Sequence, residues 1–144
     1  MSTAFHPSSL YDLTVMHNGF LKAAALLGII SVALGAFSAH SLKGMVSEHA
    51  VATFETAVRY QFYHVFALMI TGIIFKDVKF KTVIWAGWFF IAGIILFSGS
   101  LYALSMVQAA VRPGYKWIGP ITPIGGLCFI IGWLLLFISF FKKN

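Results

Sequence analysis

The stretch Phe54–Phe75, "FETAVRYQFYHVFALMITGIIF", carries three ionisable side chains at helical spacing and then continues as an apolar run. With a helical rise of ~1.5 Å per residue, Glu55 lies about 31 Å from Lys76, Arg59 about 26 Å and His64 about 18 Å. The hydrocarbon core of a bilayer is ~30 Å thick. A helix through this stretch would therefore place Glu55 near one interface and His64 near mid-membrane.

The composition favours a membrane as the solvent for the whole chain. Of 144 residues, 60% are hydrophobic and 10% charged, whereas soluble domains are about 25% charged. Four apolar stretches occur, at Phe20–Ala39, Tyr60–Phe75, Thr82–Met106 and Trp117–Phe141. A spanning helix needs roughly 20 such residues. The second stretch reaches this length only if the polar residues that precede it, from Ser47 onward, belong to the same helix. We expect an all-α integral membrane protein, a four-transmembrane-helix antiparallel bundle.

The short connections leave room for one membrane domain. We expect an N-terminal extension at 1–16 and a domain at 17–144, with helices at about 17–40, 48–75, 81–108 and 117–141. Ser47 is a predicted N-cap, and Pro113-Gly114 marks a turn. Pro120 and Pro123 fall in the first turns of the fourth helix, where a missing N–H matters least.

The basic residues indicate orientation. The net charge is +6, and the Lys and Arg residues sit at the ends of apolar segments. With four spans, one side holds Lys22, Lys76, Lys79, Lys81, Lys142 and Lys143, and the other holds Lys43, Arg59, Arg112 and Lys116. The excess of positive charge on the first side predicts that both termini are cytoplasmic. No basic cluster interleaves with aromatic residues, so we expect no nucleic-acid partner.

Small residues recur on three of the helices. They are Ala24, Gly28, Ser31, Gly35 and Ala39 in the first, Gly93 and Ser98–Ser100 in the third, and Gly125, Gly126 and Gly132 in the fourth. Small residues let helix backbones approach closely in a membrane, where burial alone drives little association. They predict tight internal packing. The alternative is that one such face binds a membrane-protein partner or another copy of the chain.

The polar residues form the candidate site. Glu55 and Arg59 are four apart and so neighbours on a helix, with Tyr60 and His64 in the adjacent row. Because an exposed charge in lipid costs ~2.5 kcal/mol or more, we expect this stripe to face the bundle interior. The candidate ligand-binding or polar-network residues are His40, Glu55, Arg59, Tyr60, Gln61, His64, Ser98, Ser100 and Tyr102. They form either a structural network or a site that opens to the outer face and takes a small ligand, a lipid headgroup or a proton.

Motifs for catalysis or cofactor binding are lacking in the sequence. It contains no HExxH, no GxSxG, no phosphate loop and no second acidic partner for a metal. His40 and His64, the best histidine pair for haem, fall at different estimated depths. Cys128, the single cysteine, is typical of a small core residue. We predict no catalytic residue, metal or cofactor, and favour a non-enzymatic role.

Four segments carry a family resemblance. They are "LGAFSAH" (Leu34–His40), "TFETAVRYQFYH" (Thr53–His64), "LFSGSLYAL" (Leu96–Leu104) and "ITPIGGLCFIIGW" (Ile121–Trp133). With these four segments in this order, the chain resembles the small membrane-protein family labelled domain of unknown function 423. The eukaryotic relatives of that family are the transmembrane protein 256 group. Family members usually have Gly-Ala-His where this chain has Ser38-Ala39-His40. The resemblance implies a four-helix protein of the bacterial plasma (inner) membrane and no established activity, cofactor or substrate.

Three functional hypotheses follow. The first is a non-catalytic ligand- or lipid-binding protein, or an accessory subunit of a membrane complex, with membrane lipids, a membrane-protein partner or its own copies as partners. The second is a transporter or channel for a small molecule or ion. It would have to be oligomeric, because four spans are few for an internally repeated transporter. The third is an enzyme acting on a lipid or quinone.

Overall fold

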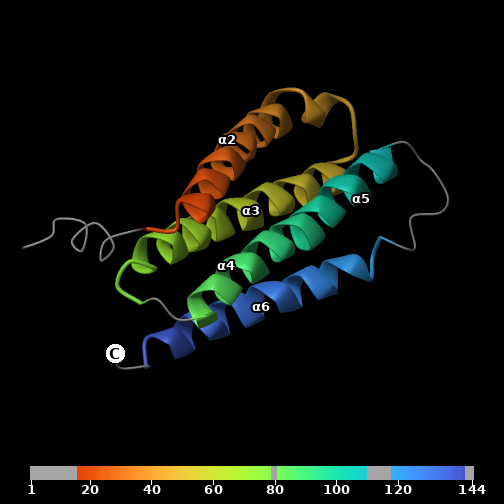
Figure 1. Cartoon of the computed structure of the whole chain (residues 1–144). Helices are drawn as coiled ribbons and strands as arrows, with labels where there is room; N and C mark the ends of the chain where they lie inside the picture. The colour runs from red at the N-terminus through yellow and green to blue at the C-terminus, as the bar shows by residue number, and fades with distance from the viewer. Residues whose placement is uncertain (1–15, 79–80, 110–117, 142–144) are drawn as a thin grey trace, which may run out of the picture.

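A computed structural model describes residues 16–78, 81–109 and 118–141, which are mostly helical (Figure 1). The helices are α2 (Asn18–His40), η1 (Leu42–Gly44), α3 (Glu48–Ile74), α4 (Lys81–Gly93), η2 (Ile94–Ser98), α5 (Gly99–Ala109) and α6 (Ile121–Ser139). Within these described residues, four helical segments are long and apolar enough to cross a membrane, with α4, η2 and α5 forming one of them. The predicted all-α, four-span architecture is confirmed. Residues 1–15 of the expected extension and the Pro113-Gly114 turn lie outside the described residues.

Local chemistry fixes where the helices begin. The Ser47 hydroxyl accepts a hydrogen bond from the backbone N–H of Ala50 at 3.3 Å, and the side chain of Glu48 lies in the first turn of α3. This is the predicted N-cap, with a favourable negative charge beside it. At α6, Pro120 is the N-cap residue and Pro123 falls in the first turn, where its missing N–H breaks no helical hydrogen bond.

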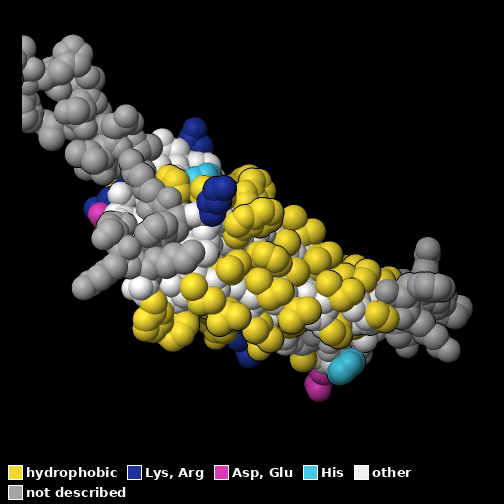
Figure 2. Space-filling model, turned by 60° about the horizontal axis from the view of Figure 1, so that its bottom comes forward, with side chains coloured by type: hydrophobic (Ala, Val, Ile, Leu, Met, Phe, Trp, Pro, Cys, Tyr) yellow, Lys and Arg dark blue, Asp and Glu magenta, His cyan; other side chains and the backbone are white. Residues whose placement is uncertain are grey.

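The helices form a row with α2 and α6 at opposite edges (Figure 1). α2 packs on α3, α3 packs on the α4–η2–α5 span, and α6 packs on α4 and η2. α2 and α3 are antiparallel, and the backbone N–H of His17 donates to the carbonyl of Gly72 at 3.0 Å. The main core includes Phe20, Leu68 and Phe90. Hydrophobic side chains cover the middle of the face in Figure 2, and most charged side chains there lie towards its ends.

Glycines allow the closest helix contacts. A Cβ atom at Gly93 would collide with the ring of Phe129, and one at Gly132 would collide with the ring of Phe90. The predicted close packing of small residues on the third and fourth helices is confirmed at these positions. In α2, Ala24 and Ser31 are buried as expected, whereas Ala39 is exposed.

The third span contains a π-helical turn, η2, which was not predicted from the sequence. A Cβ at Gly125 of α6 would collide with the backbone of Phe97, which lies within this turn. At the π-turn, α6 thus approaches the backbone of the third span too closely for a side chain at this position. Single π-turns inside helices often mark functional sites.

Candidate functional site

The predicted polar residues divide between the interior and the surface of the bundle. Gln61, His64, Ser98 and Ser100 are buried, Glu55 and Tyr102 are half-buried, and His40, Arg59 and Tyr60 are exposed. The expectation that the whole stripe faces inward is wrong for Arg59 and Tyr60. Helix geometry explains this, because the nine residues from Glu55 to His64 correspond to about two and a half turns. The two ends of the stripe therefore point in opposite directions.

Gln61 connects three helices. Its Nε2 donates to the carbonyl of Leu27 in α2 at 3.1 Å, and its Oε1 accepts from the hydroxyl of Tyr102 in α5 at 3.0 Å. Both polar atoms of a side chain that is 3% exposed are therefore satisfied. This part of the predicted set fits a structural network.

Two serines of the same span extend the network. The Ser105 hydroxyl donates to the carbonyl of Ala50 at 2.7 Å, joining α5 to α3. The Ser100 and Thr122 hydroxyls lie 2.7 Å apart and join α5 to α6. Ser98, at the end of the π-turn, has no hydrogen-bond partner for its buried hydroxyl among the described residues.

His64 is held between α3 and α6. The indole N–H of Trp133 donates to its Nε2 at 3.3 Å, and its Nδ1 lies 2.7 Å from the carbonyl of Tyr60. Because an indole N–H can only donate, Nε2 is the acceptor, and the proton is on Nδ1, which donates to Tyr60. The ring also stacks on Phe129, with centroids 3.4 Å apart and 7° between planes. Both nitrogens of this neutral imidazole are occupied.

An open groove runs between α3 and α6 beside this histidine. Its volume is about 650 Å³, within the usual range for small-molecule sites. Its lining is mostly apolar or aromatic and consists of Tyr60, His64, Phe97, Pro123, Gly126, Leu127, Phe129, Ile130 and Trp133. Gly126 leaves the groove open, since a Cβ there would meet only the Phe97 ring at 3.7 Å.

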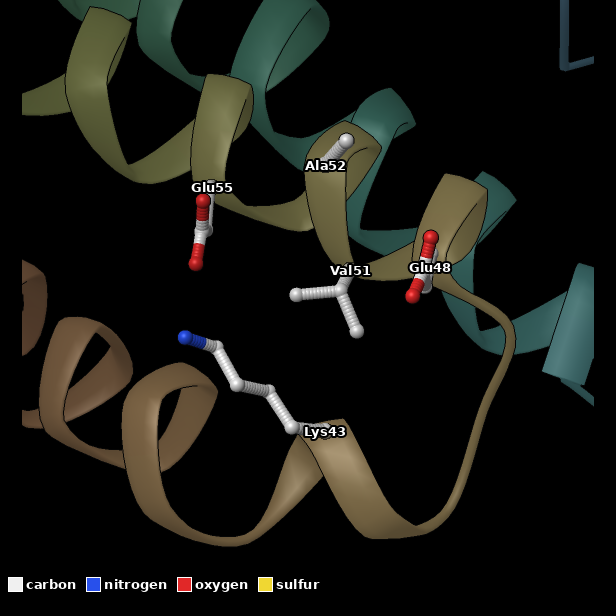
Figure 3. Close-up of a pocket in the computed structure, with 5 residues that line it drawn as sticks. All are labelled: Lys43, Glu48, Val51, Ala52 and Glu55. Atoms are coloured by element: carbon white, nitrogen blue, oxygen red, sulfur yellow. The ribbon is translucent and has the colours of Figure 1, made fainter.

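A second pocket, of about 370 Å³, lies between η1 and the start of α3. It is lined by Lys43, Glu48, Val51, Ala52 and Glu55, and the amine of Lys43 points towards the carboxylate of Glu55 (Figure 3). Among the described residues, no group of three or more His, Cys, Asp or Glu side chains could hold a metal ion. This pocket differs from the α3–α6 groove in its polar, charged wall.

Most residues of the groove were not predicted from the sequence as parts of a site. Tyr60 and His64 were in the candidate set, but Phe97, Gly126 and Phe129 were not assigned to a site. Their only sequence signal is the aromatic and glycine content of α6 and η2, and it does not say which face a residue occupies.

The chain is similar to membrane proteins of unknown function. A family model described as "Protein of unknown function (DUF423)" matches residues 34–126. A UPF0382 membrane protein of Staphylococcus aureus (strain bovine RF122 / ET3-1) is 47% identical over 123 residues, which cover 85% of this chain and 95% of that protein. The corresponding Staphylococcus haemolyticus (strain JCSC1435) protein is 46% identical with the same coverage. No solved structure matches the chain significantly.

Proposed function

We propose a non-catalytic role for this chain, which belongs to the membrane-protein family described as protein of unknown function (DUF423). In this role, the α3–α6 groove binds one membrane lipid through its acyl chain. The single observation that carries this proposal is the open, aromatic-lined groove between two spanning helices.

The position of the groove favours a lipid over a water-soluble ligand. α3 and α6 both have the length and composition of membrane spans. The neighbouring side chains Ile124, Leu134 and Phe137 on α6 are apolar and exposed. A groove on such a surface opens towards acyl chains, and flat aromatic walls provide large apolar contact areas.

The state of His64 favours binding over catalysis. Apart from Tyr60, it is the only titratable residue in the described lining of the groove. Its Nε2 accepts from Trp133 and its Nδ1 donates to Tyr60, so neither nitrogen is free to exchange a proton with a ligand. An acid–base mechanism would need at least one free nitrogen within reach of the reacting group.

The orientation of the chain is a further part of the proposal. The basic residues described at the α3–α4 end, Lys22, Lys76 and Lys81, support a cytoplasmic position for both termini. The groove and the second pocket would then lie, respectively, within the bilayer and at its outer surface. The membrane itself would be the bacterial plasma membrane.

Lipid retention tests the groove directly. The variant Gly126→Leu places a side chain in the groove, whereas Gly99→Leu places the same side chain where a Cβ meets nothing within 4 Å and outside the groove lining. In native mass spectrometry from mild detergent, the unmodified chain and Gly99→Leu should each retain one lipid, and Gly126→Leu should lose it. Equal retention by both variants, or no retained lipid on the unmodified chain, would contradict the proposal.

A further inference from the structure

Among the residues that the structure describes, no helix covers one face of α3 along most of its length. Glu55, Arg59, Tyr63, Phe66, Ile70 and Ile73, here called the α3 stripe, recur at steps of three or four residues, which is the spacing of one helix face. All are exposed except Glu55, which is half-buried. The stripe is charged near the start of α3 and apolar further along.

The two charges of the stripe are unpaired among the described residues. No ion pair joins Glu55 to Arg59, and none joins Glu55 to Lys43, although the amine of Lys43 points towards its carboxylate (Figure 3). Arg59 lies eleven residues into a 27-residue spanning helix. Charged side chains on a spanning helix usually face a protein partner or a water-filled cavity. The exposed position of Arg59 therefore points to a partner with a complementary acid at the same depth.

A second copy of the chain supplies this complement. Around the helix axis, Arg59 lies about 40° from Glu55, and Phe66, eleven residues after Glu55, lies about 20° from it, midway between the two. Suppose that two parallel α3 helices face each other across a two-fold axis that runs parallel to them, with the Phe66 side of each helix turned towards the other. The Glu55 side of one stripe then meets the Arg59 side of the other. Glu55 of each copy then faces Arg59 of the other copy.

We infer that the chain forms a parallel homodimer through the α3 stripe, with two reciprocal Glu55–Arg59 ion pairs and the Phe66 side chains at the centre. All copies insert with the same orientation because the same basic residues set it, so the two α3 helices are parallel. The ~6 Å offset in depth between the paired residues equals four helical rises, which the long arginine side chain can span. Two-fold symmetry is the commonest arrangement in homo-oligomers.

Charge reversal tests the pairing. Glu55→Arg and Arg59→Glu each leave the stripe with charges of one sign, and each variant alone should be a monomer by mass in mild detergent. Co-expressed with different tags, the two should form a heterodimer and co-purify, because all four charges are then paired across the interface. His49→Glu, which adds a charge at an exposed position of α3 outside the stripe, should remain a dimer. Dimeric single variants, or a monomeric unmodified chain, would overturn the inference.

Cross-linking in membranes gives an independent readout. In a Cys128→Ser background, Phe66→Cys should form a disulfide-linked dimer on mild oxidation. Ile130→Cys is a matched control on α6, since Phe66 is 51% exposed and Ile130 is 65% exposed, and it should remain monomeric. A dimer from the Ile130 variant and none from the Phe66 variant would place any interface elsewhere. The inference does not depend on the groove, so Gly126→Leu should remain dimeric even where it loses lipid.

Discussion

Replacing Gln61 with leucine should destabilise the bundle measurably, because this one amide joins α3 to both α2 and α5. Two interhelical hydrogen bonds are lost, one to the carbonyl of Leu27 and one from the hydroxyl of Tyr102. Interhelical hydrogen bonds in membrane proteins average ~0.6 kcal/mol each, which gives about 1.2 kcal/mol. The carbonyl of Leu27 keeps its bond from Ser31 at 2.8 Å, but the half-buried Tyr102 hydroxyl loses its partner, which costs ~1–3 kcal/mol in water-soluble proteins. The lost Leu27 bond at ~0.6 kcal/mol and the orphaned hydroxyl at ~1–3 kcal/mol together predict a loss of about 2–4 kcal/mol.

The assay is reversible unfolding in mixed micelles, with helix content followed by circular dichroism as denaturing detergent increases. Tyr102→Phe and the double variant complete a mutant cycle. In the double variant the orphaned hydroxyl is absent, so it should be less destabilised than the sum of the single changes. The reasoning is refuted if Gln61→Leu leaves the free energy of unfolding unchanged within the ~0.3–0.5 kcal/mol scatter of additive substitutions.

Three further predictions concern the α6 contacts and the orientation. Gly125→Ala should lower the free energy of unfolding by about 1–3 kcal/mol because the new Cβ would meet the backbone of Phe97. Gly126→Ala, measured in the same micelle titration, should lower it less. Equal effects of the two substitutions would contradict this packing. Trp133→Phe removes the donor to Nε2 of His64, so diethyl pyrocarbonate should modify that ring, as detected by mass spectrometry; unchanged protection would show that the indole does not shield it. An alkaline phosphatase fused to the C-terminus should be inactive and one inserted in the α2–α3 loop active, and the reverse pattern would invert the proposed orientation.

Hydropathy was sufficient to predict the spans, because each span in this chain requires a long apolar run. The N-cap at Ser47 was also predictable, since it depends on local chemistry alone and its acceptor role needs only the following backbone N–H groups. The spans and this N-cap depend on few long-range contacts. They can therefore be predicted from each local segment of the sequence.

The direction of the polar stripe could not be predicted from pairwise spacing. Steps of four residues link Glu55 to Arg59 and Tyr60 to His64, but each step turns by about 40° and the starting residues differ by five positions. His64 consequently lies inside the bundle, while Arg59 lies on its surface. The expectation that the stripe faces the interior considered one copy of the bundle alone, whereas a charged side chain on the surface of a span can also face a second copy, as in the dimer inferred above.

The groove could not be predicted because α6 is apolar on every side. A helix with no polar face gives no period from which buried and exposed positions can be separated. Phe129 is buried and Ile130 is exposed, yet both are large hydrophobic residues. The π-turn at η2 also shifts the register of the third span, which no spacing rule in the sequence indicates.

The proposed lipid site is tested most directly by photolabelling in membranes with a phospholipid that carries a photoreactive group on its acyl chain. α2 provides an internal control, since Leu26, Ile29 and Val32 are also apolar and are 59%, 69% and 63% exposed. Mass spectrometry of the labelled peptides should show labelling concentrated between Gly126 and Trp133, well above the labelling of α2, and competition by unlabelled lipid should reduce it. Labelling that follows surface exposure alone, with α2 labelled as strongly as the groove, would contradict a specific lipid site.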